Sequence, residues 1–284
     1  MAYLIRRRNS LDAEIRRILT AQLRHATRLL DHWTDDPRAS VHGARLAFKR
    51  IRAVLRLIRP GAAYIYRVED AVFRGLGHDL AQARDLESAL QAARLLESRL
   101  PTQSCRHALR RLQRSLEQRA AREYGHDLPS IMAQARETLA AAARRVPDMP
   151  LQQLRRRDVR QGVASTLGRC TSAGAQAALS RDAGDLHRWR IQVKYLYHQS
   201  QLMQQLLPGW AQQAGPVLKG IGQQLGQHHD LVLLEILGSQ PGGLGRDSHW
   251  ASIRGVALDA RNTLAAAALA AGTSTCARLP TPLA

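Results

Sequence analysis

The sequence contains an internal repeat, and this repeat constrains the possible folds more than any other feature. Eight residues of the first half recur 145 positions later without a gap: His42, Arg45, Lys49, Gly75, Gly77, Leu80, Asp85 and Leu86. A fixed period of this kind indicates a duplicated supersecondary unit. We therefore predict two related helical repeats, residues 1–147 and 148–271, followed by a disordered tail at 272–284.

Apolar residues recur at spacings of three and four along nearly the whole chain, which is typical of amphipathic helices. Alanine and leucine fill most apolar positions and aromatic residues make up only 4% of the chain, so packed helices are favoured over sheets. We predict an all-α fold of two four-helix bundles related by internal pseudo-twofold symmetry. The expected helices are 11–33, 40–58, one long stretch at 62–99, 103–122, 128–145, 151 into the 170s, 186–207, and two more on either side of 238–247.

The charge balance points to an anionic partner. The chain carries 42 Lys and Arg against 23 Asp and Glu, a formal net charge of +19. Such an excess repels itself in a compact protein unless a partner or counterions neutralise it. With two phenylalanines, Phe48 and Phe73, the chain has little with which to stack bases, so single-stranded nucleic acid is disfavoured.

The repeated helix predicted at 40–58 carries a basic ridge. At about 100° per residue, its five basic positions fall within one arc of about 80°: His42, Arg45, Lys49, Arg52 and Arg56. Apolar residues flank this arc on both sides, which predicts a ridge inside a cleft or pore rather than on a solvated face. The alternative is simple pairing with carboxylates, but the acidic residues are too few to neutralise two ridges.

The second copy of the ridge is weaker. It keeps His187, Arg190 and Lys194, but Tyr197 and Gln201 stand where the first copy has Arg52 and Arg56. We therefore expect the first copy to dominate binding.

These motifs resemble those of the CHAD family, the conserved-histidine α-helical domain. The resemblance rests on HxxRxxxKxxR at 42–52, HxxRxxxK at 187–194, and the triplets Arg84-Asp85-Leu86 and His229-Asp230-Leu231. It spans about 11–271 and implies two four-helix bundles around a basic pore or groove, inorganic polyphosphate as ligand, and association with polyphosphate granules. The ridge and the resemblance together give these candidate polyphosphate-binding residues: His42, Arg45, Lys49, Arg52, Arg56, His187, Arg190, Lys194 and Tyr197.

The sequence offers no catalytic, metal or cofactor site, so we expect a binding protein and not an enzyme. His42 and His187 have no nucleophile or carboxylate partner at a readable spacing. The cluster at 228–230 has no second ligand pair to complete a metal site, and Asp85 and Asp230 are better explained as partners of nearby arginines. The ExExK motif of the triphosphate-hydrolysing domain that often accompanies CHAD domains is missing, and the 75–77 glycines fail the nucleotide-binding fingerprint. Close helix packing is the interpretation for Gly75, Gly77, Gly220 and Gly222.

The remaining expectations concern the location of the protein and the alternative functions. No signal peptide or membrane span is evident, and three scattered cysteines suit reduced thiols, so the cytoplasm is expected. The alternatives to polyphosphate binding are a nucleic-acid-binding protein, a polyphosphate-hydrolysing enzyme, and a scaffold that recruits granule proteins. No membrane partner is expected.

Overall fold

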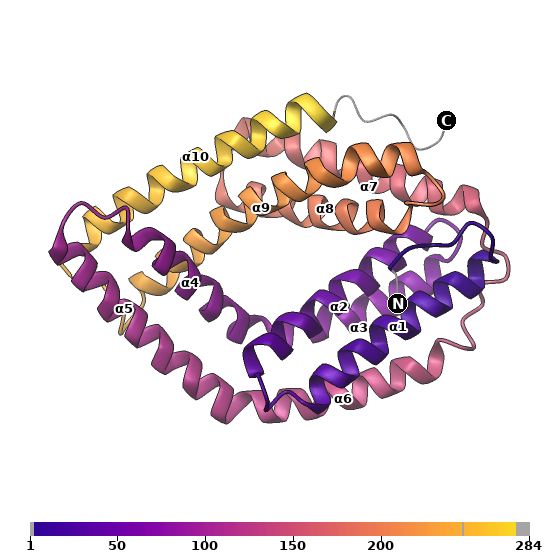
Figure 1. The fold of residues 1–284 in the computed structure, drawn as a ribbon, viewed down its shortest axis with the longest axis horizontal. Helices are drawn as coiled ribbons and strands as arrows, with labels where there is room; N and C mark the ends of the chain where they lie inside the picture. The colour runs from indigo at the N-terminus through magenta and orange to yellow at the C-terminus, as the bar shows by residue number, and fades with distance from the viewer. Residues whose placement is uncertain (1–2, 246, 277–284) are drawn as a thin grey trace.

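The fold is all-helical across the part of the chain that the structure, a computed structural model, describes: residues 3–245 and 247–276. Within those residues no strand is present (Figure 1). The helices of the first half are α1 (Leu11–Asp31), α2 (Pro37–Ile58), α3 (Ala63–Asp79), α4 (Ala81–Glu97), α5 (Gln103–Arg122) and α6 (Leu128–Arg145), with a π-helical turn η1 (Glu123–Asp127). The second half forms α7 (Arg156–Ser180), α8 (Ala183–Leu202), α9 (Pro208–Ser239) and α10 (Trp250–Cys276).

The helix bounds follow the sequence repeat. Shifting the bounds of α2 by 145 residues gives 182–203, and α8 is observed at Ala183–Leu202. The same shift carries α1 to 156–176 on α7, and α3 with α4 to 208–242 on α9. The pseudo-twofold relation between the halves stays a prediction, which this agreement supports.

Several boundaries differ from those predicted, among them the start of α7, which is Arg156 and not residue 151. The stretch 62–99 is two helices, α3 and α4, which meet at the buried Leu80. His78 and Asp79 precede this break and are weak helix formers, whereas the corresponding positions in the continuous α9 are glutamines. The helix α8 ends at Leu202, five residues before the predicted end, and α10 continues to Cys276 within the predicted tail. The rest of that tail lies outside the described residues.

Two hydrophobic clusters form the core, and both draw on both halves of the chain. The larger cluster joins α1, α2, α3 and α6 to α7, α8 and the first part of α9. The smaller cluster joins α4 and α5 to the end of α9 and the start of α10. Figure 1 shows α5 and α6 end to end along one edge of the molecule and α10 along the opposite edge. The division at residue 147 is therefore a feature of the sequence, while the packing is shared between the repeats.

The helix α2 lies at the centre of this arrangement and contacts α1, α3, α7 and α8. Its apolar face is fully buried, including Phe48, Ile51 and Leu55. Where α2 meets α7, Gly162 lies directly against the backbone of Leu57. Burial of this apolar face holds the basic side of α2 in place. No helix among the described residues is long and apolar enough to cross a membrane.

The contact between α2 and α7 predicts opposite effects of two glycine substitutions in the same helix. A Cβ atom at Gly162 would collide with the carbonyl oxygen of Leu57, whereas a Cβ at the exposed Gly168 would meet open space. We expect Gly168→Ala to stabilise the protein by about 0.5–1 kcal/mol through helix propensity. Gly162→Ala should destabilise it by about 1–3 kcal/mol, as overpacking does.

Urea unfolding followed by circular dichroism measures both free energies of unfolding. If the two variants are equally stable, the proposed closeness of α2 and α7 is wrong.

Candidate functional site

Six of the nine candidate residues meet where α2, α4, α8 and α9 come together. They are His42, Arg45 and Lys49 from α2 with His187, Arg190 and Lys194 from α8. Arg84 on α4 and His229 on α9 join them, as do the carboxylates of Asp85 and Asp230. We call this set of ten residues the central basic cluster.

Lys49 shows how crowded this centre is. Its side chain is exposed to solvent, yet the pKa of its ammonium group is lowered to about 7. The protein around it, which displaces water, is the largest cause, and Arg45, Arg190, Lys194 and Arg84 add repulsion. Lys49 is therefore accessible to a ligand and only about half charged near neutral pH.

The two carboxylates do not balance the five arginines and lysines of the central basic cluster. Burial raises the pKa of both Asp85 and Asp230. The charge of Asp85 acts mainly on Arg45, and that of Asp230 on Arg190, so the two pairings occur at the same repeat positions. The repulsion between Asp85 and Asp230 also contributes to the raised pKa of Asp85. The centre therefore keeps an excess of positive charge, with five cations against two carboxylates.

The imidazoles of the cluster are neutral donors. Nδ1 of His187 lies 3.2 Å from Nδ1 of His229, so one ring donates and the other accepts. Burial, followed by the charges of Arg190 and His187, lowers the pKa of His229 to about 3. Burial also lowers the pKa of His42, with Arg84 as the next cause. Since His42 and His187 occupy the same repeat position, both halves present a neutral histidine to the centre.

Arg52 and Arg56 lie in a different environment, at the other end of α2. Arg52 donates to both carboxylate oxygens of the buried Asp70, at 2.9 and 3.3 Å. Burial opposes ionisation of Asp70, but the hydrogen bonds and charge of Arg52 outweigh it and lower the pKa of the carboxyl group. Arg56 lies over the rings of Tyr195 and Tyr66, at 4.2 and 5.7 Å from their centroids. Simple carboxylate pairing therefore describes Arg52, but not the central basic cluster.

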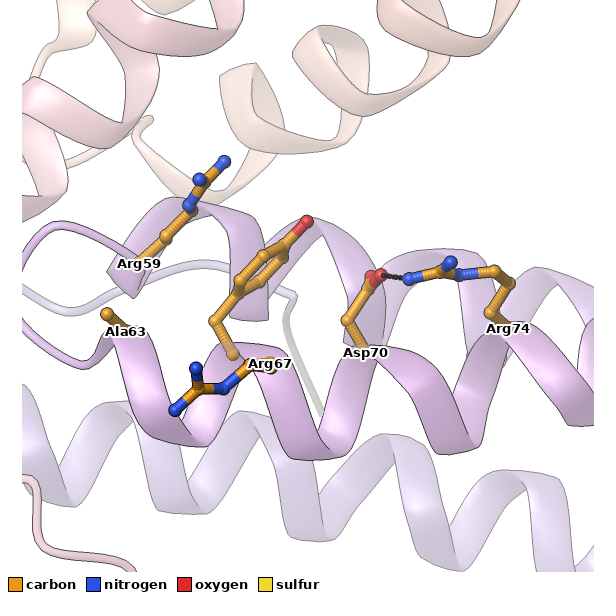
Figure 2. A pocket seen from close by; sticks show the side chains of 6 residues that line it. Arg59, Ala63, Arg67, Asp70 and Arg74 are labelled. Atoms are coloured by element: carbon orange, nitrogen blue, oxygen red, sulfur yellow. Dashed lines mark hydrogen bonds and ion pairs between the residues drawn. The ribbon is translucent and has the colours of Figure 1, made fainter.

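A pocket of about 320 Å³ continues from this end of α2 onto the start of α3. Figure 2 shows Arg74 turned toward Asp70, with which it forms a 3.1 Å hydrogen bond. The pocket is lined by Arg59, Ala63, Tyr66, Arg67, Asp70 and Arg74.

Tyr197, the ninth candidate, faces its own helix. Its hydroxyl accepts a 3.1 Å hydrogen bond from Nε2 of Gln201, and its ring packs beside His198 and against the larger hydrophobic cluster. The two residues that replace arginines in the second copy are therefore hydrogen-bonded to each other.

Arg84 and His229 are the residues that the ridge pattern misses. Both lie on helices other than the ridges, so no periodicity links them to Lys49. The repeated triplets that contain them were the available signal. The assignment of Asp85 and Asp230 as partners of arginines agrees with the structure.

Close packing is the wrong explanation for three of the four repeated glycines. A Cβ atom at Gly75, Gly77 or Gly220 would have no neighbour within 4 Å, and only one at Gly222 would touch another group, Nζ of Lys194 at 3.4 Å. The Gly77 carbonyl instead accepts a hydrogen bond from the Arg45 guanidinium. Gly75, Gly77 and Gly220 therefore border open space, and only Gly222 lies close to α8.

No group of three or more potential metal-binding side chains occurs within the described residues. Cys105 and Cys170 are buried, and the side chain of Cys276 lies outside the description.

The fold and the cluster define a helical protein with positive charge concentrated where its two repeats meet. The family model of the CHAD domain matches residues 17–237. The match covers most of the chain, so the chain belongs to the CHAD family. Its fold is similar to the crystal structure of the CHAD domain from the plant Ricinus communis, with a TM-score of 0.71 and 19% sequence identity over 99% of this chain and 96% of that chain. No curated protein matches the sequence.

The crowding around Lys49 can be tested in the free protein, because the chain has only three lysines. In protein labelled with ¹³C and ¹⁵N at lysine, one side-chain signal should titrate near pH 7, and Lys49→Arg should remove that signal. Replacing Arg190 by Gln takes away a neighbouring charge and should raise the pKa of Lys49. A Lys49 signal that titrates near its ordinary value of 10.5 would contradict this description of the site.

Proposed function

We propose that this protein binds inorganic polyphosphate at the central basic cluster. The observation that carries the proposal is the accumulation of Arg45, Lys49, Arg84, Arg190 and Lys194 in one centre. Desolvation is the largest cause of the lowered pKa of Lys49, and the other four cations add to it. Such a concentration is unfavourable without a counter-charge and attracts a polyanion strongly. CHAD domains are associated with polyphosphate binding, which agrees with this charge pattern.

A linear ligand suits the distribution of the charges. From His42 to Arg56, the ridge on α2 runs for fourteen residues, about 21 Å of helix. The neutral imidazoles of His42 and His187 supply N–H donors to phosphate oxygens, and the guanidinium groups supply paired donors. All nine candidate residues are proposed ligand contacts on this basis. Arg52 and Tyr197 contribute least, because their polar groups already have partners.

Nucleic acid fits the site less well. The two phenylalanines, Phe48 and Phe73, are 1% and 3% exposed and pack against each other in the core, so they are not accessible to bases. The tyrosines near Arg56 already hold arginine side chains on their rings. The groups available to a ligand are therefore charges and hydrogen-bond donors, which recognise phosphate and not bases.

We propose binding without hydrolysis. The cluster supplies cations and neutral imidazoles, and its carboxylates act on arginines and have raised pKa values. A protein of this type would act in the cytoplasm at polyphosphate granules, where it could also hold granule proteins.

Charge reversal tests the location of the site. Arg45→Glu with Lys49→Glu should weaken binding of fluorescent polyphosphate by more than about tenfold at constant salt, because it turns attraction into repulsion at the centre. Arg190→Glu with Lys194→Glu should reduce the affinity for polyphosphate less, because we expect the first copy to dominate binding. Fluorescence anisotropy gives the dissociation constants, and circular dichroism confirms the helical content.

A matched control is Arg122→Glu with Arg144→Glu, which makes the same change of charge at exposed positions of α5 and α6. If this control loses as much affinity as the double variant on α2, binding depends on net charge alone. Displacement of polyphosphate by tRNA at equal phosphate concentration would overturn the proposed preference.

Binding should also take up protons just above neutral pH. The pKa of Lys49 is about 7 in the free protein, and a bound anion favours the charged form and raises it. Affinity should therefore fall as the pH rises from about 7 to 8.5, and calorimetry in buffers of different ionisation enthalpy should show proton uptake. In the free protein, burial lowers the pKa of His42 and His187, so Lys49 is the group expected to titrate in this window. Lys49→Arg should remove most of the uptake, and unchanged uptake in this variant would exclude Lys49 as its source.

A further inference from the structure

The two basic ridges end at equivalent positions, and each ends beside a pocket. The pocket at the end of α2 includes Arg59 and Ala63, and a recess of about 800 Å³ at the end of α8 includes Gln204 and Pro208. These two pairs of residues are again 145 positions apart. In the first repeat, the chain that forms the ridge supplies the arginine at this position. In the second repeat it supplies a glutamine.

Arginines from elsewhere surround the recess at the end of α8. Its lining residues are Arg6, Arg7, Arg8, Asn9, Arg156, Gln204, Gln205 and Pro208. None of them is acidic, whereas the pocket on α3 contains Asp70. The side chains of Arg6, Arg7 and Arg8 are exposed. The recess therefore combines four cations with amide groups and has no carboxylate in its lining to neutralise them.

The backbone of the N-terminal segment is fixed against the end of α8. Ile5 is 1% exposed, and its N–H donates to the carbonyl of Leu202 at 2.9 Å. The N–H of Arg7 donates to Oε1 of Gln205, and its carbonyl accepts a 2.7 Å bond from the Arg156 guanidinium. Chain termini are usually poorly ordered unless they are tied down in this way. Three consecutive arginine side chains are thus displayed from a fixed backbone.

The first turn of α9 adds to the positive potential. Pro208 is its first residue, and no side chain caps the helix at Leu207. The first N–H groups of a helix lack intrahelical partners and carry partial positive charge. This is a minor contribution beside four arginines, but it has the same sign.

We propose that Arg6, Arg7 and Arg8 form a second phosphate-binding site for the same polyphosphate chain, and this inference rests on the proposed function. The segment would supply positive charge to the second repeat, whose ridge has Tyr197 and Gln201 where the first repeat has arginines. From Lys194 to Leu202, the last residue of α8, the helix advances eight residues, about 12 Å, and Gln204 lies two residues beyond its end. A ligand must therefore be long enough to reach from the central basic cluster to this recess. The site makes affinity depend on chain length.

The test compares a triple variant, Arg6→Gln, Arg7→Gln and Arg8→Gln, on a long polyphosphate and on tripolyphosphate. The backbone contacts of the segment do not need these side chains, so the fold is retained. We expect the triple variant to bind long chains at least about fivefold more weakly and tripolyphosphate with unchanged affinity. Titration calorimetry at constant ionic strength measures both. The control replaces Arg122, Arg144 and Arg254, which are exposed elsewhere, by Gln and loses the same charge.

The outcomes separate this inference from the proposed function. If the triple variant and the control bind long chains equally, the N-terminal site is wrong and the central site stands. If the triple variant also binds tripolyphosphate more weakly, the three arginines act on the central site and the proposed length dependence is wrong. If the unaltered protein binds neither ligand, the proposed function falls and this inference with it.

Discussion

The structure depends on apolar packing that holds like charges together. The basic side of α2 faces the basic side of α8. Desolvation of Lys49, together with the charges of Arg45, Arg190 and Lys194, lowers its pKa to about 7. On the opposite side, α2 is buried against α1, α3 and α7, and Gly162 lets α7 approach the backbone of Leu57. Burial of that many aliphatic side chains outweighs the repulsion between a few solvent-accessible cations. Apolar burial in the core thus offsets the repulsion between the cations of the site, and a bound polyanion would reduce that repulsion.

The duplicated helices have kept their centre and diverged at their ends. His42, Arg45 and Lys49 have identical counterparts, and Asp85 and Asp230 act on the equivalent arginines. Beyond Lys49, the ridge continues to Arg52, which is bound to Asp70, and Arg56, which lies on tyrosine rings. Beyond Lys194, Tyr197 and Gln201 bind each other, and the arginines that line the recess after the end of α8 come from the N-terminal segment and from α7. The asymmetry of binding expected from the two missing arginines stays a prediction.

The sequence predicted the site to different degrees at different residues. The site positions on α2 and α8 can be predicted from the sequence, because helical periodicity fixes which residues share a face. Arg84 and His229 were not, since they reach the centre through the packing of α4 and α9, which no local pattern encodes. The partners of Arg52 and Arg56 were missed for the same reason. Close packing is predicted for all four repeated glycines and is wrong for three of them, because spacing alone cannot distinguish a glycine that permits contact from one that borders open space.

The sequence by itself determined the helical class, the repeat of 145 residues, most helix boundaries and the faces of α2 and α8 that carry charge. Periodicity and capping are local, and a duplicated pattern repeats its local structure. The tertiary structure decided which charges meet, which of them are neutralised, and that both hydrophobic clusters are shared between the halves. It also placed Arg6 to Arg8 beside the end of α8, nearly two hundred residues away in the chain. These contacts depend on the burial of apolar faces between distant segments, so they exist only once the helices have packed.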